Sequence, residues 1–154
     1  MVDPVILYPR PAPTPTVSEQ VLYQMKNKLE NNLRRELGAE MPVVATAGPK
    51  TLRLQVAITG VDISNKGFKP YEILPVALVV KGAILAAGKR TQEVALYQEL
   101  EVTDAQTGQL LAQVVRKDFG KNLSNRDEAL TQEDADKVLQ DWAVNLRTAL
   151  HGLK

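Results

Sequence analysis

The sequence predicts an α+β fold, a mainly antiparallel sheet with three helices packed on it, in the order βαβαββα. Two long segments repeat apolar residues with the period of a helix, one following the N-terminal prolines and one at the C-terminal end. Between them, segments such as TLRLQVAITGV alternate apolar and polar residues, which is typical of half-buried strands. We expect residues 1–16 to form a short strand and a proline-rich connector, and residues 17–154 to form a single α+β domain.

The N-terminal segment is expected to be extended. Residues 4–8, PVILY, form an apolar run suited to a short strand, because a proline at its first position needs no ladder hydrogen bond. Prolines at every second position from Pro9 to Pro15 then restrict the backbone to extended conformations. We interpret this part as a stiff connector, with a proline-recognition motif as the alternative.

Two helices are predicted from apolar stripes of helical spacing. The first covers residues 17–37, with Thr16 or Ser18 as its cap. The last begins after Thr131, which caps a first turn rich in carboxylates, where the helix dipole favours negative charge. Trp142 lies on the apolar stripe of this last helix, and we expect it to be a core anchor.

Three further strands are predicted in the middle of the chain. The first lies in residues 51–61, with Val43–Ala45 as a candidate short strand before it, and a loop is expected over residues 62–71. Residues 93–103 and 110–119 then form a hairpin, in which turn residues including a glycine permit the reversal. Adjacent valines near the centre of the second hairpin strand suggest that it is covered on both faces there.

The segment VVKGAILAAGKRT, residues 79–91, resembles a phosphate-binding loop but does not fit one. Such a loop needs four residues between its glycines, and here there are five. The hydroxyl that should follow the lysine is replaced by Arg90. Residues 74–87 are apolar apart from Lys81, so we predict a mostly buried helix over residues 75–87. A partner subunit, the first helix or a membrane surface is expected to cover its outer face.

Composition limits the possible functions. The 154 residues carry 19 Lys and Arg against 18 Asp and Glu, so no strong field attracts nucleic acid. There is no cysteine, which excludes disulfides and thiolate chemistry within this chain. No apolar run is long enough to span a membrane, and no signal peptide is expected in the first residues.

No catalytic constellation stands out, and we expect no enzymatic activity, no cofactor and no metal. The only histidine, His151, lacks a second member for a triad or a zinc site, and we expect it to face solvent. Glu99 and Glu101 share a strand face with Tyr97, which we interpret as a wetted sheet surface. The DFG triplet beginning at Asp118 stands without the other kinase motifs.

The segments LRLQVAITGVD, EILPVALVVKGAILAAGK, VALYQELEVTDAQTGQLLAQVVRKDFGK and DWAVNLRTALHGL resemble a bacterial lipoprotein family, domain of unknown function 3313. The resemblance covers about residues 5–153 and implies a protein on the periplasmic side of the outer membrane of Gram-negative bacteria. Family members are anchored by a lipid-bearing cysteine, and this chain has none, so membrane attachment is expected only through an anchor absent from it. The family implies no catalytic residues.

The preferred hypothesis is a non-enzymatic envelope protein, a protein-binding or structural module. Its partner is expected to be another envelope protein or a second copy of the chain. The candidate partner surface is the apolar helix, through Val79, Val80 and Ile84. The alternative is a binder of a small apolar or lipid ligand, in a pocket between that helix and the hairpin.

Overall fold

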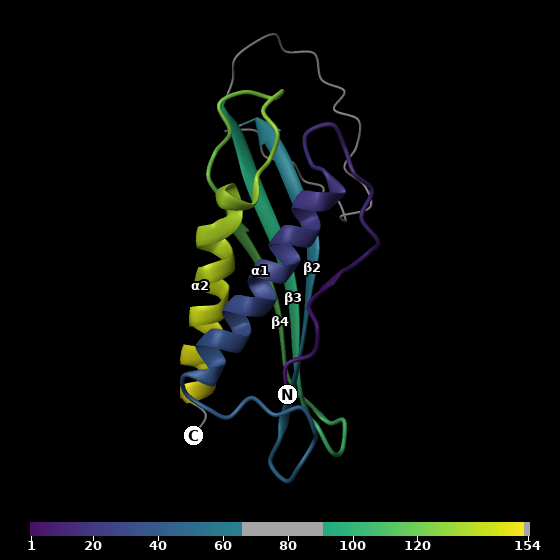
Figure 1. The fold of residues 1–154 in the computed structure, drawn as a ribbon, viewed down its shortest axis with the longest axis vertical. Helices are drawn as coiled ribbons and strands as arrows, with labels where there is room; N and C mark the ends of the chain where they lie inside the picture. Colours follow the sequence, from purple (N-terminus) through teal and green to yellow (C-terminus); the bar gives the residue numbers. More distant parts are fainter. Residues whose placement is uncertain (66–90, 153–154) are drawn as a thin grey trace.

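A computed structural model describes residues 1–65 and 91–152, which form a four-stranded sheet with two helices on one of its faces (Figure 1). The strands are β1 (Ile6–Leu7), β2 (Leu52–Asn65), β3 (Gln92–Asp104) and β4 (Leu110–Phe119), and the helices are α1 (Glu19–Gly38) and α2 (Gln132–His151). The predicted α+β class is confirmed, and the described elements follow the order βαβββα with two helices where the sequence predicts three. The predicted helix over residues 75–87 lies outside the described residues.

The sheet has the order β1-β2-β3-β4, with β1 parallel to β2 and the other pairs antiparallel. This confirms a mainly antiparallel sheet. The hairpin between β3 and β4 closes as predicted, because Gly108 adopts a φ of 72° that L side chains rarely adopt. The Asp104 carboxylate supports the turn by accepting hydrogen bonds from the backbone N–H groups of Gln106 and Thr107.

α1 begins at Glu19, two residues after the predicted start, and α2 begins directly after Thr131 as predicted. Ser18 caps α1, where its Oγ accepts a 3.2 Å hydrogen bond from the Val21 N–H. At α2 the Asp134 carboxylate accepts hydrogen bonds from the N–H and hydroxyl groups of Thr131, a capping box that fixes the first turn. Neither described helix combines the length and apolar character that crossing a bilayer requires.

The core lies between the helices and the inner face of the sheet. Trp142 is 1% exposed and is confirmed as a core anchor. The largest fully buried aliphatic side chains come from both helices, the sheet and the connecting segments: Leu22, Met25, Leu29, Leu33, Ile58, Leu96, Leu123, Leu130 and Leu139. The division of the chain at residue 16 stays a prediction, although Val2 and Val5 of the N-terminal segment contribute to this core.

Two predicted strands differ from those observed. The strand over residues 4–8 is reduced to Ile6–Leu7, because the Val5 N–H donates a 3.1 Å hydrogen bond to the Glu30 carboxylate of α1 instead of joining a ladder. The candidate strand at Val43–Ala45 is absent. Both edges of β2 are already paired, with β1 and with β3, so the segment finds no open edge there.

The predicted loop over residues 62–71 is wrong for its first four residues, because β2 continues to Asn65. A bulge between Ile58 and Gly60 shifts the register by one residue, after which Asp62 pairs with Ala95. Alternation places Asp62 and Ser64 on the face away from the helices. Asn65 lies on the opposite face, where its Oδ1 accepts a 2.8 Å hydrogen bond from the Gln92 side chain. The remaining residues of the predicted loop lie outside the described part of the chain.

Candidate binding face of the sheet

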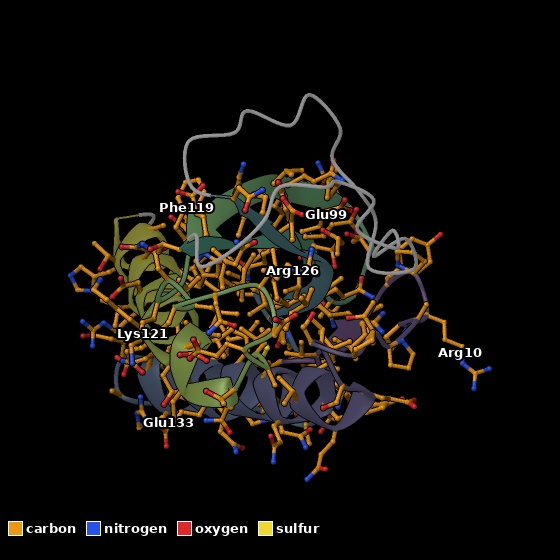
Figure 2. All side chains as sticks on the ribbon, turned by 90° about the horizontal axis from the view of Figure 1, so that it is seen from above. Arg10, Glu99, Phe119, Lys121, Arg126 and Glu133 are labelled. Carbon is orange, nitrogen blue, oxygen red and sulfur yellow. The ribbon has the colours of Figure 1, made fainter. Side chains whose placement is uncertain are left out.

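The candidate site is the face of the sheet that points away from α1 and α2, here called the outer face. Strand alternation buries Leu54 of β2 under the helices and places the neighbouring Gln55 on the outer face, where it is exposed. Figure 2 views the molecule along its long axis and shows Glu99 of β3 and Phe119 of β4 on the side away from α1. Within residues 1–65 and 91–152, no helix packs on this face.

Large apolar side chains are exposed along β4. Val115 is 69% exposed, and Phe119 and Leu111 are 52% and 51% exposed. We call these three side chains, which recur every four residues, the β4 apolar row; Val115 and Phe119 lie on the outer face, and Leu111 is the extra residue at the bulge. The sequence suggested that the middle of β4 is covered on both faces, and the exposure of Val115 shows this to be wrong. In the described ranges β4 is the last strand of the sheet, so the described part of the chain gives it a strand neighbour on only one side.

A lysine and two aromatic rings adjoin this row. The Nζ of Lys117 lies 5.4 Å from the ring centroid of Tyr97 and 5.0 Å from that of Phe119, within cation–π range of both. Burial raises the pKa of Asp62 above its ordinary value, and the nearby positive charge of Lys117 offsets only part of this rise in pKa. The sequence analysis expected Tyr97 on a solvent-exposed sheet surface, but its side chain is only 7% exposed.

A groove of about 410 Å³ lies near the other edge of the outer face. Its walls come from the N-terminal segment, β2 and β3, and its lining residues are Asp3, Pro4, Ile6, Tyr8, Gln55, Val56, Ala57, Glu99, Leu100 and Glu101. Arg53 beside it donates to the Asp3 carboxylate at 2.8–2.9 Å, so one of the three acidic side chains is neutralised. The Glu101 carboxylate accepts a 3.1 Å hydrogen bond from the side-chain amide of Gln113. The groove combines apolar surface with carboxylates.

The described residues of the outer face present carboxylate, amide and apolar side chains. Glu99 and Glu101 lie on this face as predicted. No group of three or more metal-binding side chains occurs among the described residues. Asp118 of the DFG triplet lies on the opposite face, where its carboxylate accepts a hydrogen bond from Trp142. His151 is exposed as predicted, and its Nδ1 lies 3.4 Å from the Glu40 carboxylate.

The structure does not place the sequence-predicted partner surface. Val79, Val80 and Ile84 lie outside the described residues, so their role stays a prediction. The β4 apolar row escaped the sequence analysis because local alternation cannot distinguish an edge strand from an inner one. The signal available was the order of the strands: the last strand of a hairpin-connected series commonly ends at a sheet edge.

The family comparison agrees with the fold. A family model described as "Protein of unknown function (DUF3313)" matches residues 1–146. The chain belongs to this family. This DUF3313 chain is similar to the uncharacterized lipoprotein YdcL of Escherichia coli K12, with 38% identity over 143 residues that cover 93% of this chain and 64% of that protein. The YdcL protein of Escherichia coli O157:H7 matches with the same values. The chain thus spans less than two thirds, 64%, of the length of these relatives.

A solved structure shares the fold of this DUF3313 chain. It is described as a neuraminyllactose-binding hemagglutinin homolog from Helicobacter pylori, and it superposes with a TM-score of 0.52. The match covers 97% of this chain and 81% of the other at 13% sequence identity. At 13% identity this likeness concerns only the arrangement of helices and strands. The resemblance to the lipoprotein family that the sequence indicated is confirmed by the family model and by YdcL.

Proposed function

We propose that this DUF3313 chain is the folded domain of a non-enzymatic, lipoprotein-type envelope protein, which binds another protein through β4 and the outer face. The observation that carries the proposal is the exposure of Val115, 69%, beside Phe119 and Leu111 on a ten-residue edge strand. Exposed apolar side chains that recur along one strand, here alternating with Gln113 and Lys117, favour an interaction surface, because covering them removes apolar area from water. An edge strand also offers unpaired backbone groups to a partner.

The envelope location is inferred from the relatives. YdcL is named a lipoprotein, and this chain resembles it over nearly its whole length. We infer that the protein resides on the periplasmic side of the outer membrane, held by a lipid attached outside these 154 residues, which contain no cysteine. Fractionation of cells that express the natural gene tests this, and recovery of the protein with the cytoplasm would contradict it.

The non-enzymatic part of the proposal is supported by the side chains that the outer face presents. They are mostly aliphatic, amide and carboxylate groups, which suit contact with a partner better than bond making. The predicted surface of Val79, Val80 and Ile84 stays a second hypothesis for the partner's position. It predicts that Val80→Asp or Ile84→Asp weakens binding of the partner protein. The β4 proposal predicts instead that Val115→Asp weakens this binding.

The experiment for the β4 proposal is photo-crosslinking in living cells of the source bacterium. A photoreactive amino acid at Val115 is expected to give a discrete adduct with a protein. The matched control carries the same group at Gln24, an exposed position of α1 on the opposite side of the molecule. Equal yields at the two positions, or no adduct from position 115, would contradict the proposed function.

The rival function, binding of a small ligand, has support of its own in the groove of about 410 Å³. That volume is within the range of small-molecule sites. Ile6 and Tyr8 offer apolar and aromatic surface, and Glu99 and Glu101 add negative charge, so the groove suits an apolar body that carries a positive group. Native mass spectrometry tests it: a co-purifying small molecule that is lost in Glu99→Gln would favour this rival.

A further inference from the structure

Among the described residues, β4 has an unpaired edge that is long and regular. β4 covers ten residues without proline or glycine, whereas β1, at the other edge of the sheet, covers two. Proteins usually blunt an exposed edge by shortening it, or by placing proline, a bulge or charged side chains in it. Here the bulge lies at one end, next to Leu110 and Leu111, and the charged side chains of Arg116, Lys117 and Asp118 lie in the other half of the strand. Beyond the bulge, β4 pairs with β3 in unbroken register. The β4 edge is therefore suited to accept another strand.

The ladder between β3 and β4 shows which backbone groups point outward. The Gly120 N–H donates a 2.9 Å hydrogen bond to the Val94 carbonyl. In an antiparallel ladder residues alternate between bonding to the neighbour and pointing away from it, so the even-numbered residues of β4 bond to β3. The odd-numbered residues Gln113, Val115, Lys117 and Phe119 direct their N–H and carbonyl groups away from the sheet.

One self-pairing register fits these side chains. If Val115 pairs with Val115 of a second antiparallel β4, then Gln113 of each copy faces Lys117 of the other. The same register brings Phe119 of each copy beside Leu111 of the other, at the bulge. Apolar side chains then face apolar ones, and the two polar side chains face each other, on the outer face of both sheets.

The neighbouring registers are worse. Moving the centre to Arg116 places two arginines directly opposite each other, and it sets Val115 against Lys117. Moving it to Val114 sets Val115 against Gln113, and Leu111 against Lys117. Like charges directly opposite destabilise a strand pair, and apolar pairs stabilise it. In the register centred on Val115 no like charges meet, because Arg116 faces Val114 and Asp118 faces Ala112.

We propose that two copies of this chain associate through antiparallel pairing of their β4 strands, centred on Val115, into one continuous sheet with four strands from each copy. This inference rests on the proposed function of β4 and names its partner. Twofold pairing of one surface with itself is the commonest form of assembly in soluble proteins. The helices of both copies then lie on the same side of the joined sheet.

Cysteine cross-linking tests the inference, since the chain has no cysteine of its own. In Val115→Cys the two Cα atoms of the central pair would be about 5.5 Å apart, within reach of a disulfide. We expect a covalent dimer under mild oxidation. Glu99→Cys, exposed on the same face one strand inward, would place its two Cα atoms about 14 Å apart and is expected to form no covalent dimer.

The register has its own control. Gln113→Cys chains alone are expected not to cross-link, because their Cα atoms would be separated by about 13 Å along the strands. A mixture of Gln113→Cys and Lys117→Cys chains is expected to yield the mixed dimer. Cross-linking of Gln113→Cys chains alone, or equal rates for Val115→Cys and Glu99→Cys, would overturn the pairing.

Light scattering of the unmodified chain and of Val115→Asp separates this inference from the proposed function. We expect the unmodified chain to reach twice its 16.9 kDa mass with rising concentration and Val115→Asp to remain a monomer with an unchanged circular dichroism spectrum. A monomeric chain whose residue 115 cross-links to a different protein in cells would overturn the inference and leave the proposed function standing. A monomeric chain without any adduct would overturn both.

Discussion

The indole Nε1 of Trp142 on α2 donates a 2.6 Å hydrogen bond to the Asp118 carboxylate on β4. The indole is buried, and the carboxylate belongs to a strand whose outer face is exposed. This bond ties the second helix to the edge strand, between residues 24 positions apart in sequence. It also explains why an aspartate stands in the triplet that resembles a kinase motif: its role here is to satisfy a buried donor.

Loss of the Asp118 acceptor is expected to destabilise the fold. Asp118→Ala leaves the buried Trp142 N–H without its partner, which costs about 1–3 kcal/mol of the free energy of unfolding. Asp118→Asn keeps an acceptor oxygen, and its free energy of unfolding is expected to fall by less than that of Asp118→Ala. Urea denaturation measures both, with Asp127→Ala, at an exposed loop position, as the control. Equal stabilities for Asp118→Ala and Asp127→Ala would show that the bond contributes nothing.

Gly120 is expected to tolerate no side chain. A Cβ atom there would lie 2.5 Å from the Asp134 carbonyl oxygen, which already accepts a 2.7 Å hydrogen bond from the Lys121 N–H. Gly120→Ala must therefore move the start of α2 away from β4, at a cost of about 1–3 kcal/mol. Gly48→Ala is the control, because its Cβ would meet ordinary contacts at 3.6 Å. Thermal unfolding that gives the same midpoint for the two variants would refute the close approach.

Glu36 is expected to make stability depend on pH in the acidic range. A hydrogen bond from Gln140, together with Arg35 and Arg147, lowers the pKa of Glu36 below its ordinary value of 4.5. A carboxylate with a lowered pKa in the folded state stabilises the protein above pH 4.5, and this contribution disappears as pH falls through the lower value. Unfolding measured against pH should therefore show Glu36→Gln less stable than the unmodified chain at pH 7, with the gap closing in acid. A gap independent of pH would contradict this.

Asp62 is expected to make stability depend on pH in the direction opposite to that of Glu36. Burial raises the pKa of Asp62 above its ordinary value of 3.8, so the folded state binds its proton more tightly than the unfolded state. Folding therefore loses stability as pH rises through the higher value, and Asp62→Asn should be more stable than the unmodified chain at pH 7. The gain should stay below about 1 kcal/mol, because solvent screens a half-buried group. The prediction would be contradicted if Asp62→Asn were only as stable as the unmodified chain at pH 7 and less stable than it in acid.

The sequence predicted those parts of the fold that depend on local pattern. Both described helices, their caps and the hairpin follow from residue spacing and from turn chemistry, as the positions of Ser18, Thr131 and Gly108 show. The extension of β2 could not be predicted, because Asp62 and Ser64 have the composition of a loop and the preceding bulge leaves no clear local signal. Pairing with β3 decided the conformation of these residues.

The candidate site was predicted less well, for a related reason. Exposure of Val115 depends on which strand lies at the sheet edge, and that is a property of the whole sheet. The pair Glu99 and Glu101 was correctly placed on one face with Tyr97, since alternation alone determines it. Its relation to a groove depends on the N-terminal segment, which reaches β2 from far away in sequence.

The most direct test of β4 as a binding edge is amide hydrogen exchange, residue by residue, at low and high protein concentration. The Val114 N–H bonds to β3 and should be protected at both concentrations, whereas the Val115 N–H points outward and should become protected only when a second strand pairs with it. Protection of Val115 that rises with concentration while that of Val114 stays constant is the result we predict. Fast exchange at Val115 under every condition, including in the presence of the cell-envelope fraction, would contradict a role for this edge in binding.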